Sequence, residues 1–131
     1  MKKQNIDYEA ELEALPPGLD KSVGKAIAKY SDVRPMKRGE LISTMAMLGY
    51  VINDEKDVRD AIHRLRNIGF LICARSGKNG GYWLAKTMEQ YFKFRQKEFI
   101  SKISDMSSTV KVMDAAARAR FGDGVQLGLP I

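Results

Sequence analysis

The sequence has little of the chemistry on which disulfide-stabilised and zinc-binding proteins depend. Its 131 residues include one cysteine, Cys73, and one histidine, His63. A single cysteine cannot form an intramolecular disulfide or supply a zinc site, which favours a reducing compartment. Long hydrophobic runs are lacking too, because no stretch approaches the ~18 to 20 apolar residues of a membrane span. The N-terminal segment is acidic and amphipathic, unlike a signal peptide, so we expect a cytoplasmic protein that does not associate with membranes.

Residue patterns typical of catalysis are also lacking in the sequence. There is no catalytic pair of carboxylates, no nucleophile with a base, no cluster of metal ligands and no phosphate-binding glycine loop that leads into a helix. His63 has no ligand partner in its spacing, so we expect a surface position or a base contact for it. We therefore expect a protein that is not an enzyme and that uses no cofactor and no metal.

Positive charge is what the sequence has in excess. The formal net charge is +6 and the isoelectric point is near 9.5. Residues 1–17 carry a net charge of −2, which leaves +8 on the rest of the chain. Because excess positive charge favours polyanionic partners, nucleic acid is the first class of partner to consider.

The hydrophobic pattern predicts three helices after a short N-terminal arm. Residues 1–18 end in Pro16-Pro17-Gly18 and are interpreted as a loosely attached arm. Apolar residues then recur at helical spacing over about 19–30, 37–48 and 53–68. The positions predicted to be buried in these segments are Leu19, Val23, Ala26, Ile27 and Tyr30, then Leu41, Ile42, Met45 and Leu48, and finally Val58, Ala61, Ile62, Leu65 and Ile68.

The third helix has the clearest start and stop signals. Asn53 or Asp54 can cap the free amides of its first turn, and Gly69 stands where a left-handed residue ends a helix. Directly after it, the apolar runs 70–74 and 82–85 flank the loop RSGKNGG, which contains three glycines and two cations. A strand, a glycine-rich loop and a second strand predict a β-hairpin with a basic tip.

The order of three helices followed by a hairpin carries a resemblance to a known family. The segment RGELISTMAMLGYVINDEKDVRDAIHRLRNIGFLICARSGKNGGYWLA resembles the helix-turn-helix and wing of small bacterial and phage winged helix-turn-helix DNA-binding proteins. The runs DVRDAIHRLRNIGF and GGYWLA carry most of the likeness, which covers residues 19–86. The resemblance implies a mainly α (α+β) fold with a two-stranded wing. It also implies double-stranded DNA binding in transcriptional control or replication.

The resemblance places candidate DNA contacts on the third helix and the wing. Side chains opposite the apolar stripe would contact bases in the major groove: Lys56, Arg59, Asp60, His63 and Asn67. Cations beside that face, at the start of the second helix and at the hairpin tip would contact the sugar-phosphate backbone: Arg64, Lys37, Arg38, Arg75 and Lys78. The alternative is a solvated surface, because cations and acids are equal in number between Asn53 and Gly69.

Residues 87–121, after the hairpin, have the pattern of a long helix. Thr87 and Gln90 fit a capping box, and one helix of about 35 residues, ~52 Å long, is permitted. Steps of four and three relate the residues of a heptad seam, Phe92, Gln96, Phe99, Ile103, Met106, Val110, Met113 and Ala117. Poor helix formers at 104–109 leave a pair of helices as an alternative. The seam can fold back on its own domain or pair with a second chain, and its length favours a homodimer through residues 90–120.

The tail, residues 122–131, begins with the glycine-broken run Gly122-Asp123-Gly124 and ends in an apolar segment, Gln126 to Ile131. Its end, QLGLPI, resembles the short peptides by which bacterial replication and repair proteins bind the sliding clamp. The resemblance implies clamp contacts by Gln126, Leu127, Leu129 and Ile131. The alternative is a tail that packs on the domain or on a dimer partner. A clamp ligand favours replication, and a packed tail favours regulation.

Two other functions stay open from the sequence. One is an adaptor, in which the winged helix, the long helix and the tail recruit replisome partners by protein contacts. The neutral third helix favours it. The other is single-strand or RNA binding, which predicts tighter association with unpaired oligonucleotides than with duplex.

Overall fold

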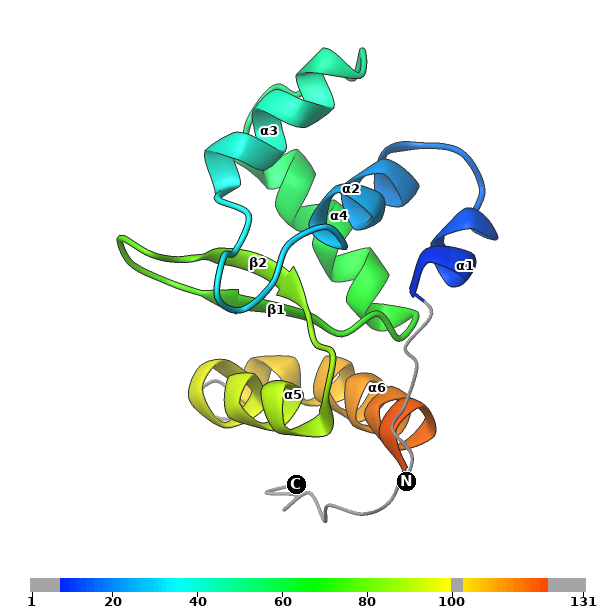
Figure 1. The fold of residues 1–131 in the computed structure, drawn as a ribbon, viewed down its shortest axis with the longest axis vertical. Coiled ribbons are helices and arrows are strands. Elements are labelled where there is room, and N and C mark those ends of the chain that lie inside the picture. Colours follow the sequence, from blue (N-terminus) through cyan, green and yellow to red (C-terminus); the bar gives the residue numbers. More distant parts are fainter. Residues whose placement is uncertain (1–7, 100–102, 123–131) are drawn as a thin grey trace.

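The computed structural model describes residues 8–99 and 103–122, which form a mainly helical fold with one two-stranded antiparallel sheet. The helices are α1 (Tyr8–Glu13), α2 (Leu19–Ile27), α3 (Arg38–Met47), α4 (Glu55–Asn67), α5 (Met88–Phe94), the π-helical turn η1 (Arg95–Phe99) and α6 (Ile103–Phe121). The strands are β1 (Ile72–Arg75) and β2 (Gly81–Leu84). Figure 1 shows the hairpin between α1 to α4 on one side and α5 and α6 on the other. Within the described ranges, no helix combines the length and apolar character needed to cross a membrane.

The first hydrophobic core forms where α2, α3 and α4 pack together. The apolar stripes predicted for these helices supply most of it, and Val23, Leu41 and Leu65 are fully buried. Two predicted core positions are wrong, because Leu48 and Ile68 are 60% and 61% exposed. Each is the C-cap residue of its helix, where the chain leaves the helical path and the side chain leaves the apolar stripe.

Local signals set both ends of α4, as the sequence predicts. The Lys56 amide donates a hydrogen bond to Asp54 Oδ1 at 2.8 Å, which caps the first turn. Gly69 follows the helix with a φ of +105°, a conformation that favours glycine. The chain therefore turns at Gly69 and enters the hairpin.

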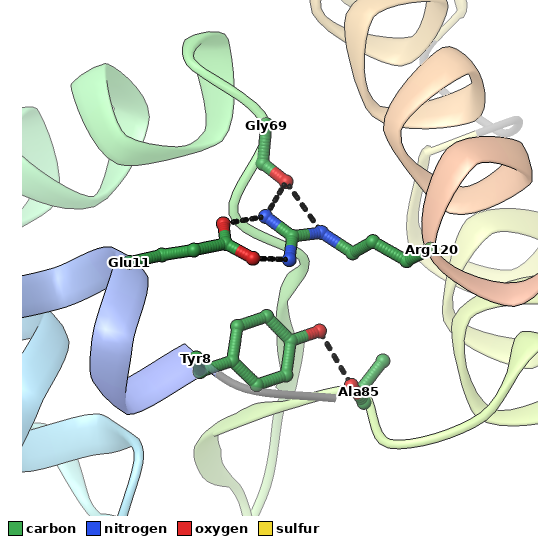
Figure 2. A network of polar contacts seen from close by, with 5 residues as sticks. All are labelled: Tyr8, Glu11, Gly69, Ala85 and Arg120. Atoms are coloured by element: carbon green, nitrogen blue, oxygen red, sulfur yellow. Dashed lines mark hydrogen bonds and ion pairs between the residues drawn. The ribbon is translucent and has the colours of Figure 1, made fainter. Parts of the chain in front are cut away.

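Helix α1 is packed onto the rest of the fold, so the expectation of a loosely attached arm is wrong for Tyr8–Glu13. Tyr8 and Leu12 are 6% and 1% exposed. Leu12 fits against Gly24 of α2, where an added Cβ would lie 2.5 Å from Leu12 Cδ2. The Tyr8 hydroxyl donates to the carbonyl of Ala85 at 2.6 Å (Figure 2). Both α2 and the segment after β2 therefore hold α1 in place.

The hairpin is buried on both faces at its base. Ile72 lies opposite Leu84, and Cys73 lies opposite Trp83. The first pair belongs to the core with α2, α3 and α4, and the second pair belongs to a core with α5 and α6. Because successive side chains of a strand point to opposite faces, one short hairpin serves both cores.

The hairpin is also joined to the segment that precedes α3. The Met36 amide donates to the Tyr82 carbonyl at 2.8 Å, and the Tyr82 amide donates to the Met36 carbonyl at 2.9 Å. Gly81 permits this approach, because an added Cβ would lie 2.5 Å from the Met36 oxygen and the residue has a φ of +149°. The bridge places the hairpin loop beside the start of α3.

The segment after the hairpin folds back on itself, so of the two alternatives for residues 87–121 the helical pair is confirmed and the single continuous helix is not. Helices α5 and α6 are separate and pack against each other (Figure 1). Asp114 of α6 accepts hydrogen bonds from the Tyr91 hydroxyl at 2.6 Å and from Arg95 Nε at 2.8 Å. Arg95 and Asp114 are both buried. Residues 104–109, where a break was the alternative, lie within α6.

Part of the predicted heptad seam is buried inside the protomer. Val110, Met113 and Ala117 are fully buried in the second core. These side chains cannot meet a second chain unless that core opens, so they give no support to dimerisation. The homodimer stays a prediction.

Candidate nucleic-acid interface

A cleft of about 490 Å³ separates the start of α3 from the hairpin loop. Four cations line it, Lys37, Arg38, Arg75 and Lys78, together with neutral residues of the hairpin. None of its lining residues is acidic. We refer to it as the basic cleft. Its charge suits a phosphate group.

Two cations of the basic cleft are held by neutral groups. Lys37 Nζ donates to the Lys78 carbonyl at 3.0 Å, which ties the start of α3 to the hairpin loop. Arg75 Nη2 donates to the carbonyls of Asp32 and Asn79 at 3.1 and 3.2 Å. Because a carbonyl carries no net charge, the positive charge of both side chains remains available to an anion.

Arg75 does not project from the loop as predicted. It is the last residue of β1 and is half-buried. Its guanidinium lies 5.3 Å from the centre of the Trp83 ring, a cation–π contact that holds it against the end of the hairpin. Lys78, in contrast, is exposed in the loop. The cleft thus contains one held arginine and one exposed lysine from the hairpin.

Arg38 is the cation of the cleft that has a charged partner. Its Nη1 lies 3.1 Å from Glu55 Oε1, which joins the starts of α3 and α4. The Tyr82 hydroxyl and then the Glu55 carboxylate raise the pKa of the Arg38 guanidinium. The Glu55 carboxylate therefore offsets part of the Arg38 charge, and the cleft owes its unopposed positive charge to Lys37, Arg75 and Lys78.

The outer face of α4 differs from the cleft, because carboxylates match two of its cations. Lys56 Nζ lies 2.9 Å from Asp60 Oδ2, one turn further along the helix. Their hydrogen bond raises the pKa of Lys56 and lowers the pKa of Asp60. Arg64 makes two hydrogen bonds of 2.8 Å to Asp20 of α2, and this contact raises the pKa of Arg64.

Of the other predicted base contacts on α4, Asn67 is hydrogen-bonded within the protein, whereas Arg59 and His63 are exposed. Asn67 uses both ends of its amide, because Nδ2 donates to the His63 carbonyl at 2.9 Å and Oδ1 accepts from Thr109 of α6 at 3.2 Å. Arg59 and His63 have exposed side chains that make no hydrogen bond or ion pair with another described residue. They are four positions apart and so lie on one face of the helix.

The structure brings some predicted DNA contacts together and separates others. Lys37, Arg38, Arg75 and Lys78 share the basic cleft, whereas Arg64 is not among its lining residues and is engaged with α2. The predicted clamp contacts, Gln126, Leu127, Leu129 and Ile131, lie outside the described residues.

Sequence reasoning missed two carboxylates that control this surface. Asp20 pairs with Arg64 across 44 residues of chain, and Glu55 pairs with Arg38 across 17. No local spacing connects such residues. The Lys56 and Asp60 pair does have a sequence signal, the spacing of four residues on a helix.

The thiol of Cys73 is buried in the second core and does not line the basic cleft. Burial raises the pKa of the Cys73 thiol to about 12, so the sulfur stays protonated at neutral pH. In the described part of the chain, no three histidine, cysteine, aspartate or glutamate side chains are grouped so that they could hold a metal ion.

Comparison of the chain with protein-family models, curated protein sequences and solved structures finds no match.

Proposed function

We propose that this protein is a non-enzymatic double-stranded DNA-binding protein with a winged helix-turn-helix domain over residues 19–86, serving transcriptional control or replication. The element order supports this fold, because α2, α3 and α4 are followed directly by the hairpin. The bridge between Met36 and Tyr82 sets the hairpin loop beside the start of α3. In this arrangement α4 faces a groove of the duplex and the hairpin contacts the adjacent backbone.

The observation that carries the proposal is the basic cleft. Cations from two elements far apart in the sequence line one cleft that has no acidic lining residue. Lys37 and Arg75 are already held by carbonyls, so less side-chain entropy is lost when a phosphate binds. A duplex backbone offers a continuous row of phosphates and releases counterions when these are neutralised.

Duplex affinity measured against salt concentration tests the proposal. A labelled mixed-sequence duplex is titrated with the protein at several salt concentrations, and fluorescence anisotropy reports binding. If Lys37, Arg75 and Lys78 contact phosphates, the logarithm of the association constant falls with the logarithm of salt concentration with a slope of about −3. Absence of binding at low salt, or a flat salt dependence, would contradict the proposal.

A pair of double variants locates the contact. Lys37→Ala with Lys78→Ala should make the slope shallower by about 2, because two phosphate contacts are lost. The control, Lys93→Ala with Lys111→Ala, removes the same charge from exposed positions on α5 and α6 that do not line the basic cleft. The control should leave the slope unchanged. Equal effects of the two variants would show that net charge alone attracts DNA.

An adaptor that recruits partners by protein contacts is the second candidate. Its support is a group of exposed apolar side chains at the turn between α3 and α4, where Met47, Leu48 and Val51 are 87%, 60% and 83% exposed. Contiguous exposed apolar surface is typical of protein contact sites. An adaptor would bind duplex weakly at every salt concentration, so the same titration separates the two candidates.

Two predicted partners need tests of their own. Sedimentation of the full chain tests the homodimer. Titration with a bacterial sliding clamp tests the predicted tail peptide, and Leu129→Ala should abolish that binding if the peptide is the ligand.

A further inference from the structure

We infer that the chain holds duplex DNA of nearly any sequence by its backbone, and that base reading by α4 is limited to Arg59 and His63. The inference rests on the proposed DNA binding and concerns its specificity. It follows from a difference between the partners of the cations in the basic cleft and the partners of the side chains on α4.

Lys56 is poorly placed to read a base because Asp60 accompanies it. The ammonium group would have to leave a contact of 2.9 Å before it could bond a base edge. The Asp60 carboxylate would then remain on the same helix face without its partner. An unpaired carboxylate among the phosphates opposes entry into the groove.

Arg64 has the same limitation in a stronger form. Its two hydrogen bonds of 2.8 Å to Asp20 occupy the planar edge of the guanidinium that would otherwise bond a guanine or a phosphate. Asp20 comes from α2, so this carboxylate also stays close when α4 approaches DNA. Both acids therefore reduce the attraction of α4 for a duplex.

Asn67 is engaged for a different reason. Its amide bonds the His63 carbonyl and the Thr109 hydroxyl, so both of the groups that would pair with adenine already have partners. It is the last residue of α4 and lies against α6. Reading a base would require that this contact between helices be broken.

The basic cleft has the opposite balance. Lys37 and Arg75 are bonded to carbonyls, which hold the side chains without neutralising them. The attraction for DNA is therefore concentrated where phosphates bind and is weak where bases would be read. Phosphate contacts fix the position of a protein on the duplex but carry no sequence information.

Arg59 and His63 remain as base readers on an exposed face of α4. A good bidentate contact discriminates against the wrong base by roughly ten- to a hundredfold. Sequence-specific proteins reach preferences of about 10³ to 10⁷ over non-specific DNA. Arg59 can make one such bidentate contact, whereas His63 can make only a single hydrogen bond, which adds up to about tenfold. Together they predict a preference of at most about a thousandfold.

Selection from a random duplex library tests the inference. The affinity of the full chain for the most enriched sequence is compared with its affinity for a scrambled duplex at one salt concentration. We expect a ratio of at most about a thousandfold. Arg59→Ala and His63→Ala should bring the ratio towards one while the salt dependence is retained.

Lys56→Ala is the matched control for Arg59→Ala, because it also removes one exposed cation from α4. Unlike Arg59, Lys56 is paired with Asp60. The control should leave the ratio unchanged. A ratio above about a thousandfold, or a loss of preference in Lys56→Ala as large as in Arg59→Ala, overturns the inference and leaves DNA binding intact. Absence of duplex binding at low salt overturns the proposed function and the inference together.

Discussion

Arg120, near the end of α6, holds Glu11 of α1 in a two-pronged ion pair across 109 residues of chain. The two nitrogen–oxygen distances are 2.6 and 2.7 Å, and Arg120 also donates to the carbonyl of Gly69 (Figure 2). The guanidinium lies 4.9 Å from the centre of the Tyr8 ring. One side chain therefore connects the last helix to the first helix and to the turn that ends α4.

Replacing Arg120 with alanine should lower the free energy of unfolding by about 2–3 kcal/mol. The change removes charge-assisted hydrogen bonds to Glu11 and Gly69 and the cation–π contact with Tyr8. Glu11→Gln should cost less than about 1 kcal/mol, because the Glu11 side chain is nearly half exposed. Urea denaturation followed by circular dichroism measures both values.

Arg118→Ala is the control for this prediction, because Arg118 lies two residues away on the same last turn of α6. Its cost should be within about 0.5 kcal/mol of zero. If Arg118→Ala and Arg120→Ala cost the same, general loss of charge or helix propensity explains the effect, and the link between the first and last helices does not stabilise the fold.

Asp114→Asn should destabilise the protein by about 3–5 kcal/mol, because it leaves the guanidinium of Arg95 buried without a counter-charge. Arg95 is 0% and Asp114 is 2% exposed. Replacing both at once, with Arg95→Met and Asp114→Leu, should cost less than the single change, since no unpaired charge remains. Urea denaturation of the two variants measures their free energies of unfolding and tests this order. A double variant less stable than Asp114→Asn would contradict this account.

The helices and their ends were predictable where the signals are local. Asp54 caps α4 and Gly69 ends it, since a cap and a left-handed glycine act within a few residues. The capping box of α5 was predictable in part. Thr87 Oγ1 accepts from the Gln90 amide, whereas Gln90 Oε1 accepts from the Lys86 amide instead of from Thr87.

The packing of the segment after the hairpin was not predictable from its periodicity. A heptad pattern is the same for two helices of one chain as for one helix of each of two chains. In this chain the buried ion pair between Arg95 and Asp114 joins two helices of the same chain. The two residues are 19 positions apart, so no local spacing in the sequence reveals the pair. The pairing of Arg64 on α4 was not predictable either, because its partner Asp20 comes from another helix.

Cys73 should be unreactive in the folded protein and reactive once the protein unfolds. Burial raises the pKa of its thiol from 9.0 to about 12, so very little thiolate forms at pH 8. Labelling with a chromogenic disulfide reagent at pH 8 should be slow in buffer and fast in urea. Fast labelling in buffer would show that the hairpin opens away from the second core.

The raised pKa of Cys73 predicts how the free energy of unfolding depends on pH. The unfolded chain releases the thiol proton at a lower pH than the folded chain, so the free energy of unfolding should fall as pH rises from about 9 towards 12. Cys73→Ala removes this contribution, and its stability should fall less steeply over that range. Burial also raises the pKa of Tyr8 and Tyr91, so some dependence should remain in the variant. Parallel curves for the two proteins would contradict the prediction.

Neutralising the acids beside α4 should increase the affinity for duplex DNA. Asp60→Asn frees Lys56 and Asp20→Asn frees Arg64, and each freed cation should make the salt slope steeper by about 1 if it reaches a phosphate. Glu9→Gln on α1 is the control with the same change in net charge, and it should have the smaller effect. Anisotropy titrations at several salt concentrations measure all three variants. Because Asp60→Asn also releases Lys56 towards base edges, this variant should show a larger sequence preference than the wild type. Equal effects of the three variants would mean that the pairing of Lys56 and Arg64 has no influence on DNA binding.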